Sequence, residues 1–360
     1  MRLGVEAAIV EGELVPGDVE VAGGQLAELG LSGPGSGVAV PGFVDLQVNG
    51  FAGVDLLAEP ERVGEVDEAL ARRGVLAWQP TLITAAPEDV LRALPLLEAH
   101  GVLGVHLEGP FLSPAKPGTH PVRHLREPDL ELLRRYLDAG SVSMVTLAPE
   151  LPGALALVDE LVARGVVVSL GHSNATAAEA RAGFEHGAAT VTHLFNAMRT
   201  FGHRDPGIAG AALADEELPV MAIVDGVHLA PETALLAWRA ARGRFAVVTD
   251  AIAAAGTGDG DYTLGEVEVH VEGGVCTRAD GTLAGSVVTM DASIRNLVEL
   301  GVPPVEAVAA VTSVPARIAG RDDLGVLYRG GPANLVVLDD RLELARVLRA
   351  GEEVVRGAGG

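Results

Sequence analysis

The sequence predicts an α/β fold, a (β/α)8 TIM barrel with a small β-sandwich domain built from both termini. Eight apolar segments alternate with helical patterns between residues 41 and 329. Strand-like segments with glycine-rich turns lie at 1–40 and 330–360. Hydrophobic residues make up 48% of the 360 positions, enough material for a large core. Eight strand–helix repeats favour a closed barrel over a doubly wound sheet.

The eight expected barrel strands are short runs rich in Val, Leu and Ala, as strands buried on both faces should be. They span 43–48, 76–81, 103–108, 143–148, 166–171, 189–194, 220–225 and 246–251. Most of the segments between them have apolar residues at helical spacing. After the eighth strand, the pattern of 260–285 predicts a β-hairpin insertion, and a helical tail follows it.

The two ends of the chain share a different pattern, in which short strands are separated by tight turns. The expected strands lie in 4–10, 12–21 and 25–31 and again in 334–339, 345–350 and 352–357. Chain termini often lie close together in a folded domain. We therefore expect residues 1–40 and 330–360 to pair into one small β domain.

Composition excludes several classes of function. The formal net charge is −23 and the isoelectric point about 4.7, whereas a nucleic-acid-binding protein needs a basic surface. The N-terminus lacks a signal-peptide pattern and no apolar run is long enough to cross a membrane. Cys276 is the only cysteine, which excludes internal disulfides and cysteine-rich zinc sites. We expect a cytoplasmic protein that acts on a small molecule.

Ionisable residues gather where the predicted strands end. Glu108, His172, His193, His228 and Asp250 each lie in or just after a strand. The carboxyl ends of barrel strands meet at one mouth, so residues far apart in sequence converge there. Two histidines and one glutamate are a common catalytic zinc set that leaves a position open for water. Each histidine alone would suit a core or capping role, but the joint pattern favours a metal site at Glu108, His172 and His193.

Asp250 is the natural general base of such a site. An aspartate after the last strand can sit beside a metal-bound water and accept its proton. The structural alternative is an N-cap for the segment that follows it.

Seven stretches in chain order carry a family resemblance: PGFVDLQVNG, HLEGPFLSPAKPGTHP, SLGHSNAT, VTHLFNAM, HRDPG, DGVHLAPE and VVTDAIAAAG. They resemble the N-acetylglucosamine-6-phosphate deacetylases of the amidohydrolase superfamily, over about residues 41–290. The resemblance implies a TIM barrel, a divalent metal and hydrolysis of the acetamide of N-acetylglucosamine 6-phosphate to glucosamine 6-phosphate and acetate, a step of amino-sugar catabolism or cell-wall recycling. The alternatives are deacetylation of N-acetylgalactosamine 6-phosphate, which differs at one hydroxyl, and the activity of another mononuclear amidohydrolase.

The resemblance also implies roles for single residues. It assigns the metal to Glu108, His172 and His193 and the acid/base role to Asp250. The implied substrate contacts are His120 at the carbonyl, the backbone of Asn196 and Ala197 at the phosphate side, and Arg204 and His228 at the phosphate and sugar hydroxyls. A guanidinium suits phosphate because its planar fork offers two parallel donors. A homodimer is implied as well, with the partner completing the phosphate end, while His106 and His203 receive no role.

Gln47 and Asn49 stand where many amidohydrolases carry a His-x-His pair that holds a second metal. Both alternate with apolar residues, which places them on one strand face together with Asp45. Amide oxygens are weaker zinc ligands than imidazole. The pair therefore predicts a vacant second-metal position and one divalent metal per subunit, Zn²⁺ first, with Fe²⁺, Mn²⁺ and Co²⁺ as alternatives.

Two competing classes have little support in the sequence. Amidohydrolases with a lysine-bridged metal pair carry the lysine on the fourth strand, but the only lysine, Lys116, follows the third expected strand. A relative that binds a ligand without turnover would have lost Asp250 or a metal ligand, and all of these residues are present.

Overall fold

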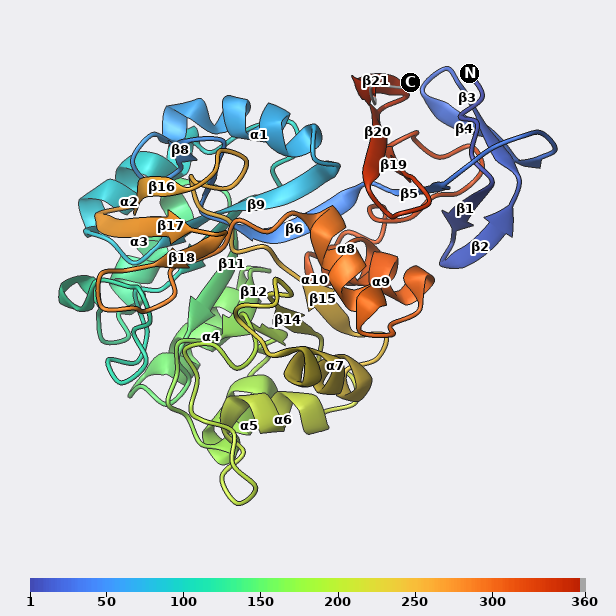
Figure 1. Ribbon diagram of the computed structural model, residues 1–360. Helices are drawn as coiled ribbons and strands as arrows, with labels where there is room; N and C mark the ends of the chain where they lie inside the picture. Colours follow the sequence, from blue (N-terminus) through green and yellow to red (C-terminus); the bar gives the residue numbers. More distant parts are fainter. Residues whose placement is uncertain (357–360) are drawn as a thin grey trace.

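The computed structural model describes residues 1–356, and its main body is a barrel of eight parallel strands surrounded by helices (Figure 1). The barrel strands are β6 (Phe43–Val48), β9 (Val75–Ile83), β10 (Val105–Glu108), β11 (Val142–Leu147), β12 (Val167–Leu170), β13 (Thr190–Val191), β14 (Val220–Ala222) and β15 (Phe245–Val247). Each expected strand overlaps one of these, so the predicted TIM barrel is confirmed.

Two contacts join the sheet segments into a ring. Six strands pair in the order β13-β12-β11-β10-β9-β6, and β14 pairs with β15. The Leu194 amide donates to the Met221 carbonyl over 2.7 Å, which links the end of β13 to β14. Val48 forms a parallel bridge with Ala251, which links β6 to the segment after β15. A closed ring brings all the carboxyl ends to one mouth.

The opposite end of the barrel is filled by apolar side chains. Val44, Met144, Met221 and Val248 are buried and pack with Val314 in one core cluster. Val314 belongs to α10 (Ser313–Ile318), which contacts β6 and β15. This apolar plug confines the polar chemistry to the mouth.

Helices form the outer layer of the barrel (Figure 1). They are α1 (Val63–Ala71), α2 (Pro87–Ala93), α3 (Leu130–Ala139), α4 (Ala154–Ala163), α5 (Ala177–Glu185), α6 (Gly207–Ala214), α7 (Pro231–Ala240), α8 (Met290–Glu299) and α9 (Pro304–Ala310), with short 3₁₀ turns at η1 (Pro60–Arg62), η2 (Leu94–Leu96) and η3 (Val122–His124). The helical patterns did not predict α6. Its sequence, GIAGAALA, contains only small and apolar residues, so no polar stripe marks a helical period.

The two chain ends meet beside the barrel (Figure 1). The N-terminal strands are β1 (Ala7–Val10), β2 (Glu13–Pro16), β3 (Asp18–Ala22), β4 (Gln25–Leu31) and β5 (Val38–Pro41), and the C-terminal strands are β19 (Leu335–Leu338), β20 (Leu344–Arg349) and β21 (Glu352–Arg356). One sheet runs β2-β1-β5-β19-β20-β21, so both termini contribute to it. Val19 of β3, Leu26 of β4 and Leu335 of β19 belong to one core cluster. The β3–β4 pair therefore shares the core of this unit. Residues 357–360 of the predicted domain lie outside the described residues.

An antiparallel insertion follows the last barrel strand. It contains β16 (Gly260–Leu264), β17 (Val267–Glu272) and β18 (Val275–Thr277), one strand more than the expected hairpin. A small pair, β7 (Gly50–Phe51) and β8 (Val54–Asp55), follows β6. Within residues 1–356, no helix combines the length and apolar character that a membrane span requires.

Candidate active site

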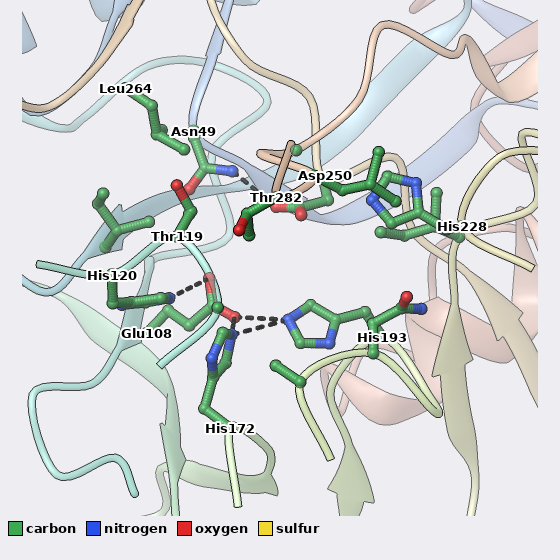
Figure 2. A pocket seen from close by; sticks show the side chains of 17 residues that line it. Asn49, Glu108, Thr119, His120, His172, His193, His228, Asp250, Leu264 and Thr282 are labelled. Atoms are coloured by element: carbon green, nitrogen blue, oxygen red, sulfur yellow. Dashed lines mark hydrogen bonds and ion pairs between the residues drawn. The ribbon is translucent and has the colours of Figure 1, made fainter. Parts of the chain in front are cut away.

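A cavity of about 220 Å³ lies at the mouth of the barrel (Figure 2). Nine of the predicted site residues line it: Asn49, Glu108, His120, His172, His193, Asn196, Ala197, His228 and Asp250. Gln47 is fully buried and hydrogen-bonds two of them. Arg204 lies elsewhere, on an exposed loop. Because the carboxyl ends of the barrel strands meet at one mouth, nearly all of the predicted site residues lie together.

Glu108, His172 and His193 point their side chains at one place (Figure 2). The Nε2 atoms of His172 and His193 lie 3.0 Å and 2.9 Å from Oε1 of Glu108 and 3.0 Å from each other. All three residues are buried, and one ligand atom from each lies within 4.8 Å of the others. Two imidazole nitrogens and a carboxylate oxygen suit Zn²⁺ or a similar divalent cation.

The imidazole of His172 is in the state that a metal ligand needs. Its Nδ1 lies 3.1 Å from the carbonyl oxygen of Lys116. A carbonyl only accepts, so we assign the ring hydrogen to Nδ1, which leaves a lone pair on Nε2. Burial lowers the pKa of His172 to about 4, and the charge of His120 adds to this effect, so the ring is neutral near pH 7.

The carboxylate of Glu108 is ionised despite its burial. Burial by itself would raise the pKa of Glu108, but the adjacent imidazoles of His120, His172 and His193 hold it well below its usual range. Burial likewise opposes protonation of His193, whereas the carboxylates of Glu108 and Asp250 raise its pKa. The cluster thus carries buried negative charge that a bound cation would neutralise.

Unusual backbone angles direct three of these side chains into the cavity. His172, His193 and Asp250 have φ angles of 47°, 29° and 50°. The left-handed region costs an L-residue about 1 kcal/mol or more, and such strain concentrates at functional sites. Each residue lies two or three positions after its strand ends, where the chain must turn sharply. The strained residues are thus two of the metal-ligand candidates and the candidate general base.

Asp250 is held in position by two amides at the end of β6, Gln47 within the strand and Asn49 directly after it. Nε2 of Gln47 and Nδ2 of Asn49 donate to its Oδ1 over 3.0 Å and 2.7 Å. Because both amides bind one oxygen, Oδ2 is left for a reacting group. Burial raises the pKa of Asp250 to about 6, and the negative charge of Glu108 contributes. A buried carboxylate with a pKa in this range suits a general base near neutral pH.

A register shift in β6 brings both amides to the same carboxylate. The pairing of β6 with β9 is irregular between Asp45 and Val48, and such bulges redirect side chains beside active sites. Gln47 also donates from Nε2 to Oε2 of Glu108 over 3.2 Å. It therefore connects the metal-ligand cluster to the base. At the predicted vacant second-metal position, both amide nitrogens are thus engaged by carboxylates.

Buried partners also fix the backbone on both sides of Asp250. Asp45 accepts hydrogen bonds from Oγ1 of Thr249 over 2.5 Å and from the Thr249 and Gln47 amides over 3.2 Å each. Ser286 donates from Oγ to the Thr249 carbonyl over 2.5 Å and from its amide to the Asp250 carbonyl over 2.9 Å. These contacts compensate the strained turn at Asp250.

His120 presents a donor to the cavity. Its Nδ1 lies 3.2 Å from the backbone amide of Thr84, which can only donate, and 3.0 Å from Oγ1 of the same residue. Nδ1 is therefore the acceptor, and Nε2 carries the hydrogen. Nε2 lies 3.7 Å from Oε2 of Glu108. A donor beside the metal-ligand cluster is suited to stabilise charge on a carbonyl oxygen.

His228 lines the cavity at some distance from the metal-ligand cluster. Its Nδ1 lies 2.7 Å from Oδ2 of Asp225, whose Oδ1 accepts the His228 amide over 2.8 Å. Burial opposes ionisation of Asp225, but its hydrogen bonds and the charge of His228 lower its pKa. Asp225 thus fixes the His228 ring and leaves its Nε2 for a ligand. Asn196 and Ala197 also line the cavity, and Ala197 has a φ of 49°.

Arg204 and His203 lie on an exposed loop outside the cavity. The neighbouring Arg199 is paired instead, with its Nε 2.7 Å from Oδ2 of Asp205. Neither Arg204 nor His203 has a hydrogen-bond or ion-pair partner within residues 1–356. In this single chain, Arg204 is therefore not part of the cavity wall.

His106, which had no predicted role, lies in the barrel interior on the strand that ends at Glu108. It is fully buried, with Nδ1 3.0 Å from the Leu46 carbonyl and Nε2 2.7 Å from Oγ1 of Thr146. Burial lowers its pKa to about 4. Oγ1 of Thr146 lies 2.7 Å from Oγ1 of Thr192, the residue before His193. A polar network thus underlies two of the metal-ligand candidates.

Several cavity residues were not predicted. Ile83, Thr119, Leu264 and Thr282 line the cavity. Thr119 directly precedes His120 in GTHP, and this position beside a predicted site residue was the only sequence signal for it. Leu264 and Thr282 come from the insertion, where the alternation of apolar and polar residues does not show which residues face the barrel.

Comparison with known families gives one match over most of the chain. The model of the amidohydrolase family matches residues 38–354. Human N-acetylglucosamine-6-phosphate deacetylase is 41% identical over 344 residues, which cover 89% of this chain and 84% of the human protein. The N-acetylgalactosamine-6-phosphate deacetylase of Escherichia coli O157:H7 is 38% identical over 325 residues, covering 87% of this chain and 86% of that protein.

Solved structures give the same picture. A variant of N-acetyl-D-glucosamine-6-phosphate deacetylase from Mycobacterium smegmatis, in complex with N-acetyl-D-glucosamine-6-phosphate, superposes with a TM-score of 0.94 at 38% identity and covers 99% of both chains. N-acetylglucosamine-6-phosphate deacetylase from Thermotoga maritima superposes with a TM-score of 0.91 at 32% identity, covering 99% of this chain and 100% of that chain. The similarity therefore extends over both the barrel and the terminal β domain.

Proposed function

The chain belongs to the amidohydrolase family, and we propose that it hydrolyses the acetamide of N-acetylglucosamine 6-phosphate to glucosamine 6-phosphate and acetate. One observation carries the proposal beyond the family: Glu108, His172 and His193 converge in a cavity that also contains the buried carboxylate of Asp250. This is the arrangement that metal-assisted amide hydrolysis requires.

The donor set fits one divalent cation per chain. Glu108 is ionised, His172 is neutral with its Nε2 lone pair toward the cluster, and His193 points its Nε2 at the same carboxylate oxygen. A cation held by these three residues would supply a Lewis acid that activates water and polarises a carbonyl. We propose Zn²⁺, with Fe²⁺, Mn²⁺ and Co²⁺ as alternatives that metal analysis distinguishes.

Asp250 moves the proton. It takes one proton from the attacking water while the new carbon–oxygen bond forms at the acetamide carbon. It then gives this proton to the amide nitrogen while the carbon–nitrogen bond breaks, so that acetate and the free amine are released. The amides of Gln47 and Asn49 keep Oδ1 occupied, which presents Oδ2 to the reacting atoms in both steps.

His120 stabilises the carbonyl oxygen. Its Nε2–H donates to the oxygen as negative charge develops there. Because Nδ1 is occupied by Thr84, the ring is fixed before the substrate binds, and no reorganisation is required during the reaction.

The phosphate is bound at the other end of the substrate. We assign this end to the backbone of Asn196 and Ala197, to His228 and to Arg204. Arg204 is exposed outside its own cavity, which suits a contribution to the cavity of a second copy in a homodimer. The homodimer and a cytoplasmic location stay predictions from the sequence.

A second candidate substrate is N-acetylgalactosamine 6-phosphate. The relative from Escherichia coli O157:H7, 38% identical, carries this substrate in its name. The two sugars differ only in the configuration at C4, which is remote from the reacting amide. The site chemistry described above would therefore serve both.

The proposal is tested by measuring acetate release from both sugar phosphates with metal-replete protein. We expect faster release from the glucosamine derivative and at least about 1,000-fold slower release by Asp250→Asn, with metal content unchanged. Faster turnover of the galactosamine derivative would select the second candidate. The absence of acetate with both sugars would overturn the proposal.

A further inference from the structure

Three polar atoms of cavity-lining residues have no hydrogen-bond partner anywhere in residues 1–356. Nδ1 of His193 belongs to the metal-ligand cluster, and the other two are Oδ1 of Asn49 and Oγ1 of Thr119. Asn49 is 3% exposed and Thr119 9% exposed, so bulk water does not satisfy them. Buried polar groups nearly always have partners, and an exception beside an active site calls for an explanation. Both residues line the proposed substrate cavity, so a bound substrate that displaces these side chains slightly can supply the missing partner.

The carboxamide of Asn49 is fixed in one orientation. Its Nδ2 donates to Asp250 over 2.7 Å, and its backbone amide donates to the Ala251 carbonyl over 2.8 Å. Rotating the carboxamide would break the contact with the base. Figure 2 shows the nitrogen directed toward Asp250 and the oxygen on the other side of the group. Oδ1 is therefore a preorganised acceptor.

Thr119 is equally restrained by its neighbours. The His120 amide donates to the Pro117 carbonyl over 3.0 Å, which closes a tight turn around Thr119. Gly118 packs so closely against His172 that a Cβ atom there would lie 3.0 Å from its Cε1. His120 is anchored to Thr84. The Thr119 hydroxyl is thus held in the wall of the cavity by the residues that surround the metal-ligand cluster.

The two atoms together select one type of chemical group. Oδ1 of Asn49 only accepts a hydrogen bond, whereas the hydroxyl of Thr119 both donates and accepts. A hydroxyl satisfies both, because it can donate to Asn49 and accept from Thr119. The phosphate, the ring oxygen and the acetyl carbonyl of the proposed substrate only accept, and its amide N–H only donates.

The position of Asn49 indicates which hydroxyl is bound. Asn49 holds Asp250, which acts at the amide nitrogen on C2 in the proposed reaction. The hydroxyls on C1 and C3 flank C2, whereas C4 and the phosphate on C6 lie farther from the amide. Resting on the proposed function, we propose that Asn49 and Thr119 bind a sugar hydroxyl adjacent to the acetamide, on C1 or C3, and thereby determine specificity for that hydroxyl.

The proposal is tested by pairing Thr119 variants with substrates that lack one hydroxyl. Wild type, Thr119→Val and Thr119→Ser are compared for kcat/KM of acetate release on the parent sugar phosphate and on its 1-deoxy and 3-deoxy analogues. Removing either partner of a buried hydrogen bond should cost about 10- to 100-fold. We expect this loss for wild type on one analogue and for Thr119→Val on the parent. Thr119→Val should lose nothing further on that analogue, and Thr119→Ser should behave as wild type.

Thr282 provides a matched control. It also lines the cavity, but it is only partly buried and its hydroxyl is not among the buried atoms without a partner. In Thr282→Val the penalty for the missing substrate hydroxyl should therefore remain in full. Exchange of the C4 configuration should not change the Thr119 effect, since C4 does not bear the bound hydroxyl.

Two results would overturn the inference while the proposed function stands. One is an unchanged kcat/KM for Thr119→Val on the parent substrate. The other is that the loss for Thr119→Val multiplies with the loss for each of the two deoxy analogues. This pattern is expected if ordered water, rather than the substrate, binds the two atoms. Failure of the wild type to release acetate from the parent substrate would instead reject the proposed function itself.

Discussion

Asn49 donates a hydrogen bond from Nδ2 to Oδ1 of Asp250 over 2.7 Å. This contact gives a role to an amide at the predicted vacant second-metal position. Gln47 donates to the same oxygen. The end of the first barrel strand is therefore tied to the proposed base, and the account of the reaction depends on this arrangement.

Removing the Asn49 amide should shift the pH dependence of turnover. Asp250 acts as a base only as a carboxylate, so kcat/KM falls as pH drops through its pKa. Burial raises this pKa to about 6, while the hydrogen bond from Asn49 lowers it, as a bound cation also would. Asn49→Leu should move the acidic limb to higher pH by about one unit, which reduces kcat/KM at pH 7 by about twofold through the ionisation of Asp250. If the acidic limb of the pH profile stayed at the wild-type pH, the effect of Asn49 on the pKa of Asp250 would be contradicted.

Restoring histidines at the end of β6 should create a second metal position. In the double variant Gln47→His with Asn49→His, two imidazoles would stand beside the Asp250 carboxylate, a nitrogen–oxygen set that binds zinc. We expect the metal content, measured by elemental analysis after dialysis, to rise from about one to about two per chain. The single variant Gln47→His is the control and should stay near one. A double variant that also stays near one would show that the position cannot hold a metal.

The hydroxyl of Thr249 should matter for turnover more than for binding. It donates to the buried Asp45 over 2.5 Å and fixes the backbone before Asp250. Thr249→Val keeps the shape of the side chain but loses the donor, whereas Thr249→Ser keeps it. We expect Thr249→Val to lower kcat by about 10- to 100-fold with KM within about twofold, because a small misplacement of the base is costly. Equal kcat values for the two variants would refute the positioning role.

Asp45 should make stability depend on pH. Burial raises its pKa from 3.8 to about 7 in the folded chain. The folded state therefore binds the proton more tightly than the unfolded state, and stability is lost as pH rises from about 4 to about 7. Against Asp45→Asn, which does not titrate, the wild type should lose up to about 4 kcal/mol across this window. Urea unfolding across this pH range measures the difference, and a constant difference would contradict the raised pKa.

The barrel was predictable because its strands are buried on both faces. Runs such as 166–171 are apolar almost throughout, and the structure places β12 within that range. The metal-ligand candidates were predictable for a related reason, since Glu108, His172 and His193 lie at strand ends that a closed barrel must bring together. By contrast, α6 consists of small and apolar residues and shows no helical period.

Other parts of the site depend on geometry that sequence patterns do not encode. The irregular pairing of β6 sends Gln47 and Asn49 to one carboxylate, which an ideal period of two does not reveal. Leu264 and Thr282 reach the cavity from an antiparallel insertion whose orientation is set by tertiary contacts. The resemblance assigns Arg204 to the phosphate, and its loop leaves it exposed outside the cavity of its own chain.

In the proposed reaction, one metal on Glu108, His172 and His193 supports deacetylation with Asp250 as the base. The most direct test adds zinc in increments to metal-free protein and follows acetate release from N-acetylglucosamine 6-phosphate. We expect activity to rise in proportion to added zinc and to reach a plateau at about one equivalent per chain. A plateau only at about two equivalents, or no acetate at any zinc level, would contradict it.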